Sequence, residues 1–246
     1  MCSGIDRDLL EREAARFLEI GKIMFQKDFV AANDGNLSAK VGENAYLVTP
    51  SGVSKGFMSR EMLLVVDGEG AVIEGDGTPS SELAMHLRVY RENPEVGAVV
   101  HAHPTFATLY AVQCVPLDQA ILAEAVVQLG CVPVAQYARP GTEEVPESVA
   151  PFCKDYNAVL LANHGALTWG DTLNRAWFRM ETLEFYARVQ YFSERGWLRE
   201  KANRLSRKQV EALLEDRRKL TGSSSGGVPN HSKLSLNNSS TMPHEG

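Results

Sequence analysis

The chain has 246 residues, of which 44% are hydrophobic and 23% charged, a composition typical of a globular protein with a full core. Its net charge of −6 and pI near 5.6 argue against a nucleic-acid partner, because they supply no positive field to attract a phosphate backbone. No apolar run is long enough to cross a bilayer and the first residues are charged, so we expect a cytoplasmic protein without a membrane partner.

Four widely spaced cysteines form no C-x-x-C pair: Cys2, Cys114, Cys131 and Cys153. Neither a disulfide framework nor a thiolate metal site is therefore indicated, and a reducing compartment fits. We expect these cysteines to be small apolar core residues.

The first third of the chain predicts one helix followed by strands. Residues 7–28 carry apolar side chains at helical spacing, and a turn-rich loop follows at 31–39. The segments 44–52 and 63–75 are short aliphatic or β-branched runs bounded by Gly, Pro or Asp, and the second contains the hairpin signal DGEG. The sheet is therefore expected to begin near residue 44.

The rest of the chain predicts helices that alternate with two buried strands, and each of these strands leads into histidine. The strands are expected over 97–104 and 158–163. Helices are expected over about 82–93, from 104 onward, over 172–195 and over 207–220. Helices that flank a mixed sheet indicate the α/β class, in one domain of residues 1–220. Residues 221–246 are rich in Ser, Gly, Asn and Pro and predict a disordered tail.

Three histidines at strand ends suggest a metal site. His101 and His103 are two residues apart, so on a strand their rings project to the same face, and His164 ends the other buried strand. Three neutral imidazoles that leave a coordination position open are typical of catalytic zinc. Nickel, manganese, cobalt or iron would accept the same nitrogens, and an isolated H-x-H is also compatible with ordinary half-buried histidines.

Glu82 is the carboxylate that best completes this site. It lies at the start of a predicted helix, where it could bind the ion at rest and move a proton during turnover. The alternative is a glutamate that only interacts with the helix dipole. His86, one turn further on, is expected to be structural.

Three short segments have the composition of an anion pocket: GNLS at 35–38, TPSG at 49–52 and PSSE at 79–82. Each combines backbone amides freed by Gly or a turn with hydroxyl or amide side chains, which together can hold a phosphate. Taken alone, each is an ordinary turn or helix cap.

The ordered motifs GNLSAKV, TPSG, PSSELAMH, AVVHAHP and NHGALTWG resemble those of the class II aldolase and adducin family, most closely its fuculose-phosphate aldolase branch. The resemblance covers about residues 8 to 215. It implies a three-layer αβα fold with a central mixed, mainly antiparallel sheet. It also implies a cyclic homotetramer with active sites between neighbouring subunits. Adducin-type relatives are not enzymes and lack the metal histidines, which this chain keeps.

The resemblance also implies roles for individual residues. His101, His103 and His164 would bind zinc, with Glu82 as a fourth ligand at rest and as the acid/base in turnover. The substrate phosphate would be bound by Asn36, Ser51, Gly52, Ser80 and Ser81, and flanked by Asn33 and Gly35.

The implied reaction is cleavage of a ketose 1-phosphate, similar to L-fuculose 1-phosphate, to dihydroxyacetone phosphate and an aldehyde through an enediolate. One departure concerns the stretch VPLDQAILAEAV, which lacks a tyrosine that such aldolases use as a second acid; Leu122 or Ala120 falls at its place. Glu124 could supply this acid, and the alternative is a glutamate on a helix surface or at a subunit interface. Tyr110 and Tyr137 are other candidates, although a structural role is expected for each. A methylthioribulose-1-phosphate dehydratase, a pentulose-5-phosphate 4-epimerase or a sugar-acid phosphate decarboxylase would keep the same metal site.

Overall fold

An eight-stranded mixed sheet forms the centre of the computed structural model, which describes residues 4–195, 203–221, 231 and 233–236. The strand order is β4-β3-β2-β1-β5-β8-β7-β6, and every pairing is antiparallel except that of β6 with β7. This confirms the predicted mixed, mainly antiparallel sheet. The strands are β1 (Asn36–Gly42), β2 (Ala45–Val48), β3 (Leu64–Val66), β4 (Val72–Glu74), β5 (Ala98–Ala102), β6 (Val134–Ala135), β7 (Ala158–Leu161) and β8 (Gly165–Gly170).

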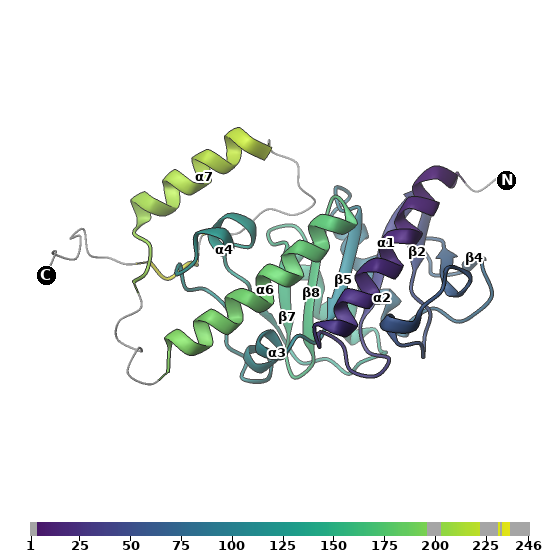
Figure 1. The fold of residues 1–246 in the computed structure, drawn as a ribbon, viewed down its shortest axis with the longest axis horizontal. Helices are drawn as coiled ribbons and strands as arrows, with labels where there is room; N and C mark the ends of the chain where they lie inside the picture. Colours follow the sequence, from purple (N-terminus) through teal and green to yellow (C-terminus); the bar gives the residue numbers. More distant parts are fainter. Residues whose placement is uncertain (1–3, 196–202, 222–230, 232, 237–246) are drawn as a thin grey trace, which may run out of the picture.

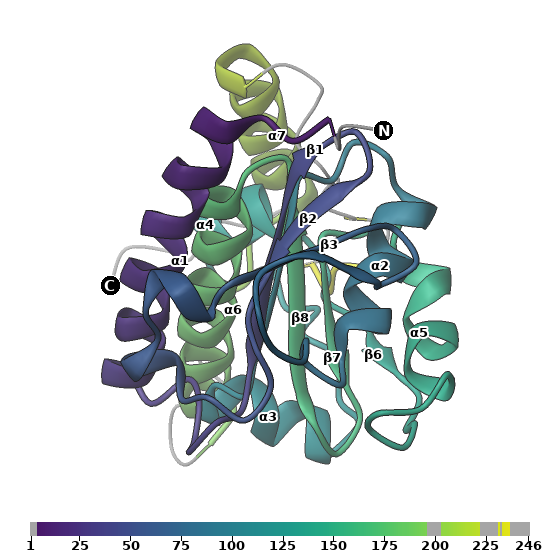
Figure 2. The same cartoon turned by 90° about the vertical axis from the view of Figure 1, so that its right-hand side faces the viewer.

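Helices cover both faces of this sheet, which gives the expected three layers (Figures 1 and 2). One face packs against α1 (Arg7–Gln26), α3 (Thr105–Val112) and α6 (Leu173–Ser193). The other face packs against α2 (Leu83–Glu92) and α5 (Glu144–Val149). The remaining helices are α4 (Ala123–Gln128), α7 (Arg207–Thr221) and the short 3-10 helices η1 (Lys55–Phe57), η2 (Arg60–Met62) and η3 (Ala150–Phe152). No helix among the described residues has the length and hydropathy needed to span a bilayer.

The two long helices start at side-chain caps that the sequence supplies. Asp6 accepts a hydrogen bond from the backbone N–H of Leu9 at 2.9 Å at the start of α1, and Thr172 accepts one from Arg175 at 3.3 Å at the start of α6. Their buried stripes then pack onto the sheet, and the predicted bounds of both helices agree with the structure to within two residues.

The alternation of β5 decides which face receives its histidine. Ala98 and Val100 join the core under α1 and α6, whereas Val99 joins the core under α2 and α5. Two residues after Val99, His101 therefore projects toward the α2 face. Antiparallel pairing of β1 with β5 sets Asn36 directly opposite His101.

Two sequence interpretations of local structure were wrong. Residues 36–39, expected to lie in a turn-rich loop, begin β1, because pairing with β2 and β5 gives their backbone partners on both sides. Cys114, expected in the core, is exposed in the turn after α3, where its φ of 53° places it in the left-handed region. Cys131 and Cys153 are buried as expected, and Cys2 lies outside the described residues.

Helix α7 ends at Thr221, and most of the tail predicted over residues 221–246 lies outside the described residues. The described part contacts the domain. The backbone of Ser235 donates to the carbonyl of Asp118 at 2.6 Å and accepts from Ala120 at 3.1 Å. His231 Nε2 bonds the carbonyl of Val126 at 2.7 Å.

Candidate metal centre and anion cleft

The structure brings the three predicted histidines together. The ring centroids of His101, His103 and His164 are 4.8 Å apart in each pair, and one nitrogen from each lies within 4.8 Å of the others. Three imidazole nitrogens at this spacing, with a carboxylate beside them, form a donor set suited to a divalent ion. These residues therefore fit a metal.

Backbone contacts orient the first histidine. The fully buried His101 donates from Nδ1 to the carbonyl of Ala166 on β8 at 2.9 Å, which leaves its Nε2 toward the cluster. His103 presents Nε2 to that same atom at 3.0 Å, while its Nδ1 lies 3.5 Å from Asp34 Oδ2. Such contacts on the second ring nitrogen are what holds a metal-binding histidine in one tautomer and orientation.

The turn that carries His164 depends on both of its neighbours. Asn163 has a φ of 57°, a left-handed conformation that Asn tolerates better than most residues. A Cβ at Gly165 would lie 2.4 Å from His103 Cδ2 and 2.6 Å from the carbonyl oxygen of Ala102. The N-H-G motif therefore fixes the position of His164, and its glycine leaves room for the ring of His103.

Glu82 lies between the histidines and β1. Its Oε2 is 3.3 Å from His101 Nε2, its Oε1 is 3.1 Å from His164 Nε2, and Asn36 Nδ2 donates to it at 2.8 Å. The side chain is only 13% exposed. Glu82 was predicted in the first turn of the helix, and it is the cap residue that immediately precedes α2.

Electrostatics separate the protonation states of the cluster. Burial, together with the charges of His101 and His164, lowers the pKa of His103 to about 3, so its ring is neutral at pH 7. Burial opposes ionisation of Glu82, but hydrogen bonds and charges from His101 and His164 hold its pKa well below the usual range. Burial also opposes protonation of His101, but the charge and hydrogen bond of Glu82 outweigh it and raise the pKa of His101. Because metal is bound by neutral imidazole and ionised carboxylate, an ion that binds here would displace the proton of His101.

A polar cleft adjoins the cluster, and its lining includes all seven residues predicted to bind or flank the phosphate. Backbone bonds join two of its walls: Ser51 N donates to Thr78 O at 2.9 Å, and Ser80 N to Thr49 O at 3.4 Å. Gly35 and Gly52 adopt the left-handed φ values of 72° and 71° that these turns require. The lining residues are Asn33, Asp34, Gly35, Asn36, Pro50, Ser51, Gly52, Lys55, Ser80, Ser81 and Glu82.

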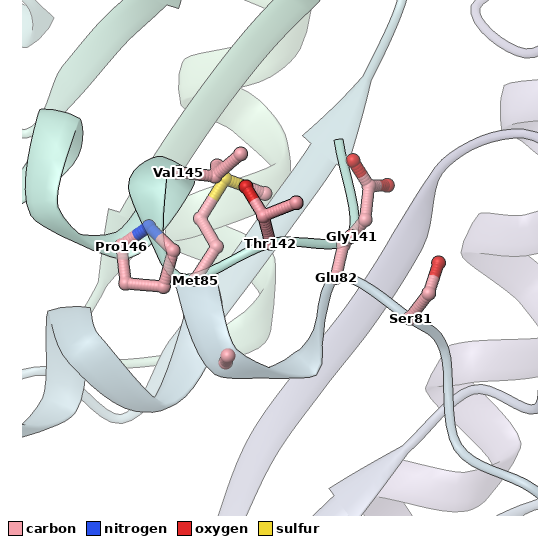
Figure 3. Close-up of a pocket in the computed structure, with 8 residues that line it drawn as sticks. Ser81, Glu82, Met85, Gly141, Thr142, Val145 and Pro146 are labelled. Atoms are coloured by element: carbon pink, nitrogen blue, oxygen red, sulfur yellow. The ribbon is translucent and has the colours of Figure 1, made fainter. Parts of the chain in front are cut away.

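Three parts of the site were missed from the sequence. Asp34 and Lys55 line the cleft although neither was selected, because a single Asp in a turn and a single Lys before a glycine carry no distinctive pattern. On the other side of Glu82, a narrow hollow lies between the start of α2 and residues 141–146 (Figure 3). Figure 3 shows Thr142 from that segment facing the residues at the start of α2.

The candidates for a second acid lie elsewhere. Glu124 is exposed on α4, and no contact within the described part of the chain joins it to the histidines or the cleft. Tyr110 donates to Glu194 Oε2 at 3.0 Å, and Tyr137 is 64% exposed. A catalytic role for Glu124 stays a prediction.

Comparison with known proteins gives the family. Residues 15–191 match the class II aldolase and adducin N-terminal domain. The chain is 36% identical over 183 residues to the 3-oxo-tetronate 4-phosphate decarboxylase of Pectobacterium atrosepticum, which covers 73% of this chain and 84% of that protein. It is 35% identical over 178 residues to the L-fuculose phosphate aldolase of Methanococcus vannielii, covering 71% and 93%.

A solved L-fuculose 1-phosphate aldolase superposes with a TM-score of 0.77 at 30% identity, covering 87% of this chain and 98% of that structure. Sequence and fold therefore agree with the motif resemblance, and the relatives named above are enzymes of sugar-phosphate metabolism. The chain belongs to the class II aldolase and adducin family.

Proposed function

We propose that this protein is a zinc-dependent enzyme that breaks a carbon–carbon bond in a phosphorylated sugar, acting as an aldolase on a ketose 1-phosphate. The proposal rests on one observation: Glu82 belongs to both the histidine cluster and the polar cleft. Glu82 contacts His101 and His164 on one side and lines the polar cleft on the other. A substrate anchored in the cleft by its phosphate would therefore present its next carbons to the histidines.

His101, His103 and His164 would hold the ion, with Glu82 beside them. When bound, a divalent ion supplies Lewis-acid stabilisation of negative charge on the oxygens next to the reacting carbon. The chain's own residues bind the substrate and move a proton. The amides and hydroxyls of the cleft anchor the phosphate, and Asn36 orients Glu82 through its 2.8 Å hydrogen bond.

In the proposed cleavage, the bond between C3 and C4 of the ketose breaks. Its electron pair goes to C3, giving an enediolate across C2 and C3, while the hydroxyl proton on C4 leaves as the aldehyde forms. Glu82, after taking up a proton from solvent water, donates it to C3 and becomes a carboxylate again, which completes dihydroxyacetone phosphate. The base that takes the C4 hydroxyl proton and releases it to solvent is proposed to be Glu124 of a neighbouring subunit, because Glu124 of the same chain lies away from the cleft.

A decarboxylase is the second candidate, favoured by the similarity to proteins named 3-oxo-tetronate 4-phosphate decarboxylase and by the exposed position of Glu124. Loss of carbon dioxide from such a 3-oxo acid leaves the same three-carbon enediolate, protonated in the same way. No C4 hydroxyl has to be deprotonated. The site would then need no second acid/base in the 115–126 segment.

Product analysis tests the proposal. The zinc-loaded protein is incubated with L-fuculose 1-phosphate and, separately, with 3-oxo-tetronate 4-phosphate. Dihydroxyacetone phosphate together with an aldehyde supports the aldolase, whereas dihydroxyacetone phosphate together with carbon dioxide supports the decarboxylase. Epimerised or dehydrated products from pentulose or methylthioribulose phosphates, with all carbons retained, would contradict both.

We also propose the homotetramer implied by the motifs. Three phenylalanines of α6 support self-association, because they are about half exposed and recur every seven residues on one stripe: Phe178, Phe185 and Phe192. Light scattering on the purified chain tests this assembly, and a monomer at micromolar concentration would contradict it.

A further inference from the structure

A buried lysine lines the anion cleft. Lys55, at the start of η1, is 1% exposed, yet its side chain reaches the same cleft as the phosphate-binding segments. Its Nζ donates to the carbonyl of Asn33 at 3.0 Å and to the carbonyl of Val53 at 2.5 Å. The ammonium group therefore joins the loop before β1 to the loop after β2.

The backbone of Lys55 is seated on α1 at a glycine. A Cβ at Gly21 would lie 2.5 Å from the carbonyl oxygen of Lys55, a distance that real Cβ atoms essentially never show. The next residue, Gly56, packs equally closely on Phe25, where a Cβ would lie 2.7 Å from the ring. Helices α1 and η1 can approach this closely only because Gly21 and Gly56 have no Cβ. The close contact fixes the backbone position from which the Lys55 side chain extends.

The charged residues that line the cleft indicate a role for Lys55. Asp34 and Glu82 are the acidic residues that line it, and Lys55 is the basic residue among the described lining. A phosphate dianion that enters would meet two carboxylates, so it needs a nearby positive charge. Burial lowers the pKa of Lys55 to about 8, against the raising effect of Asp34 and Glu82, and most of the ammonium therefore remains charged at pH 7.

We propose that Lys55 is the cationic anchor of the anion cleft and selects a phosphorylated substrate over its unphosphorylated sugar. This inference rests on the proposed function, because it assigns the residue that recognises the phosphate end. An ammonium has three hydrogens, and the bonds to Asn33 and Val53 use two of them. The third hydrogen and the charge are therefore available to an oxyanion bound in the cleft that Lys55 lines.

The test is binding of inorganic phosphate to the full chain, measured by calorimetry at pH 7 with and without zinc, so that phosphate held by the ion is separated. Lys55→Met keeps the apolar stem and removes the charge. We expect its affinity for phosphate to fall about tenfold or more, as for loss of a hydrogen bond to a charged group. The matched control is Lys22→Met on the exposed side of α1, which should bind like the wild type.

The outcomes separate the two levels of the proposal. A wild-type protein that binds no phosphate contradicts the proposed anion subsite itself. A wild-type protein that binds phosphate no better than Lys55→Met, with equal zinc content and melting temperature, overturns the role of Lys55 alone. If Lys55→Met does not fold, Lys55→Arg and Lys55→Gln are compared. Better phosphate binding by the arginine variant supports the anchor, and equal binding overturns it.

Discussion

The histidine cluster and the anion cleft share Glu82, but they are built in opposite ways. The cluster takes His101 and His164 from the ends of buried strands, and neighbouring strands hold the rings in place. The cleft is made by turns, with backbone amides and hydroxyls that approach from 33–36, 49–52 and 79–82. One buried cation, Lys55, joins the first of these turns, at Asn33, to Val53, which directly follows the second.

This difference predicts two kinds of response to mutation. Each metal ligand supplies one of only a few bonds to a single ion, so its loss should abolish metal binding and, with it, activity. Each cleft group supplies one of many hydrogen bonds to an anion, so its loss should lower affinity by a limited factor. Mutations can therefore be ranked by the region that they touch.

The largest effect is expected for the double variant His101→Ala, His103→Ala. It removes two of three imidazoles, so zinc should be absent from the purified protein and activity should fall by more than about 10²-fold. Elemental analysis and product assays provide the measurement, with His231→Ala as the control because that ring bonds a carbonyl outside the cluster. Stoichiometric zinc in the double variant would refute the site.

Glu82→Gln should come next, with turnover reduced by about 10²- to 10⁴-fold because an amide cannot exchange the proton. The fold should persist, since Asn36 still has an oxygen to which it can donate. Stopped assays and circular dichroism test this, and Glu61→Gln on the exposed η2 is the matched control. Activity equal to that of the wild type would exclude Glu82 from the chemistry.

Gly165→Ala probes the cluster without removing a ligand. The added Cβ would meet His103 and the backbone of residue 102, so we expect zinc affinity to weaken by about 10- to 100-fold. Competition with a chelator measures it. Gly4→Ala is the control, because nothing lies within 4 Å of a Cβ there. An unchanged zinc affinity would mean that the ring can move at no cost.

Ser80→Ala probes the cleft in the same graded way. Its hydroxyl accepts from Asn36 Nδ2 at 3.1 Å and from the backbone N–H of Glu82 at 3.3 Å. We expect KM to rise about five- to tenfold with zinc content unchanged. Steady-state kinetics beside Ser59→Ala, a partly buried serine whose hydroxyl donates to Glu61, provide the test. A loss of zinc would show that the two regions are not separable.

The smallest effect should be the pH dependence of sulfate binding, a probe that does not itself titrate near neutral pH. Burial brings the pKa of Lys55 down from 10.5 to about 8, so sulfate affinity should fall severalfold as pH rises from 7 to 9. Stability should move the other way in this window, because the unfolded chain binds more protons there than the folded one. Lys55→Met should show no such fall in sulfate affinity.

Periodicity and motif order were sufficient for the layers of the fold and for the residues of the cluster. The i, i+2 spacing of His101 and His103 implies a shared face wherever the strand is placed. Strand β8 was not predicted, because only four residues lie between its two terminal glycines, Gly165 and Gly170, and this run is too short to indicate a strand by itself.

The cleft was predicted only in part. Asn, Gly and Ser in turns have recognisable chemistry, so its walls could be proposed from local sequence. Lys55 could not, because its burial results from contact with α1, more than 30 positions earlier, and a lysine is ordinarily expected on the surface. Long-range packing that reverses a residue's usual environment leaves no local pattern.

The register of β1 on β5 fixes the relative positions of the cleft and the histidine cluster. Asn36 pairs with His101 across the β1–β5 ladder, so the position of this cleft residue relative to the cluster is fixed by the register of the two strands. A slip by one residue would turn every side chain of β1 to the opposite face of the sheet. A substrate bound by its phosphate would therefore place the same carbon at the cluster each time. The part of the substrate beyond the reacting carbon is not constrained by this strand pairing. One scaffold can thus serve enzymes whose departing fragments differ.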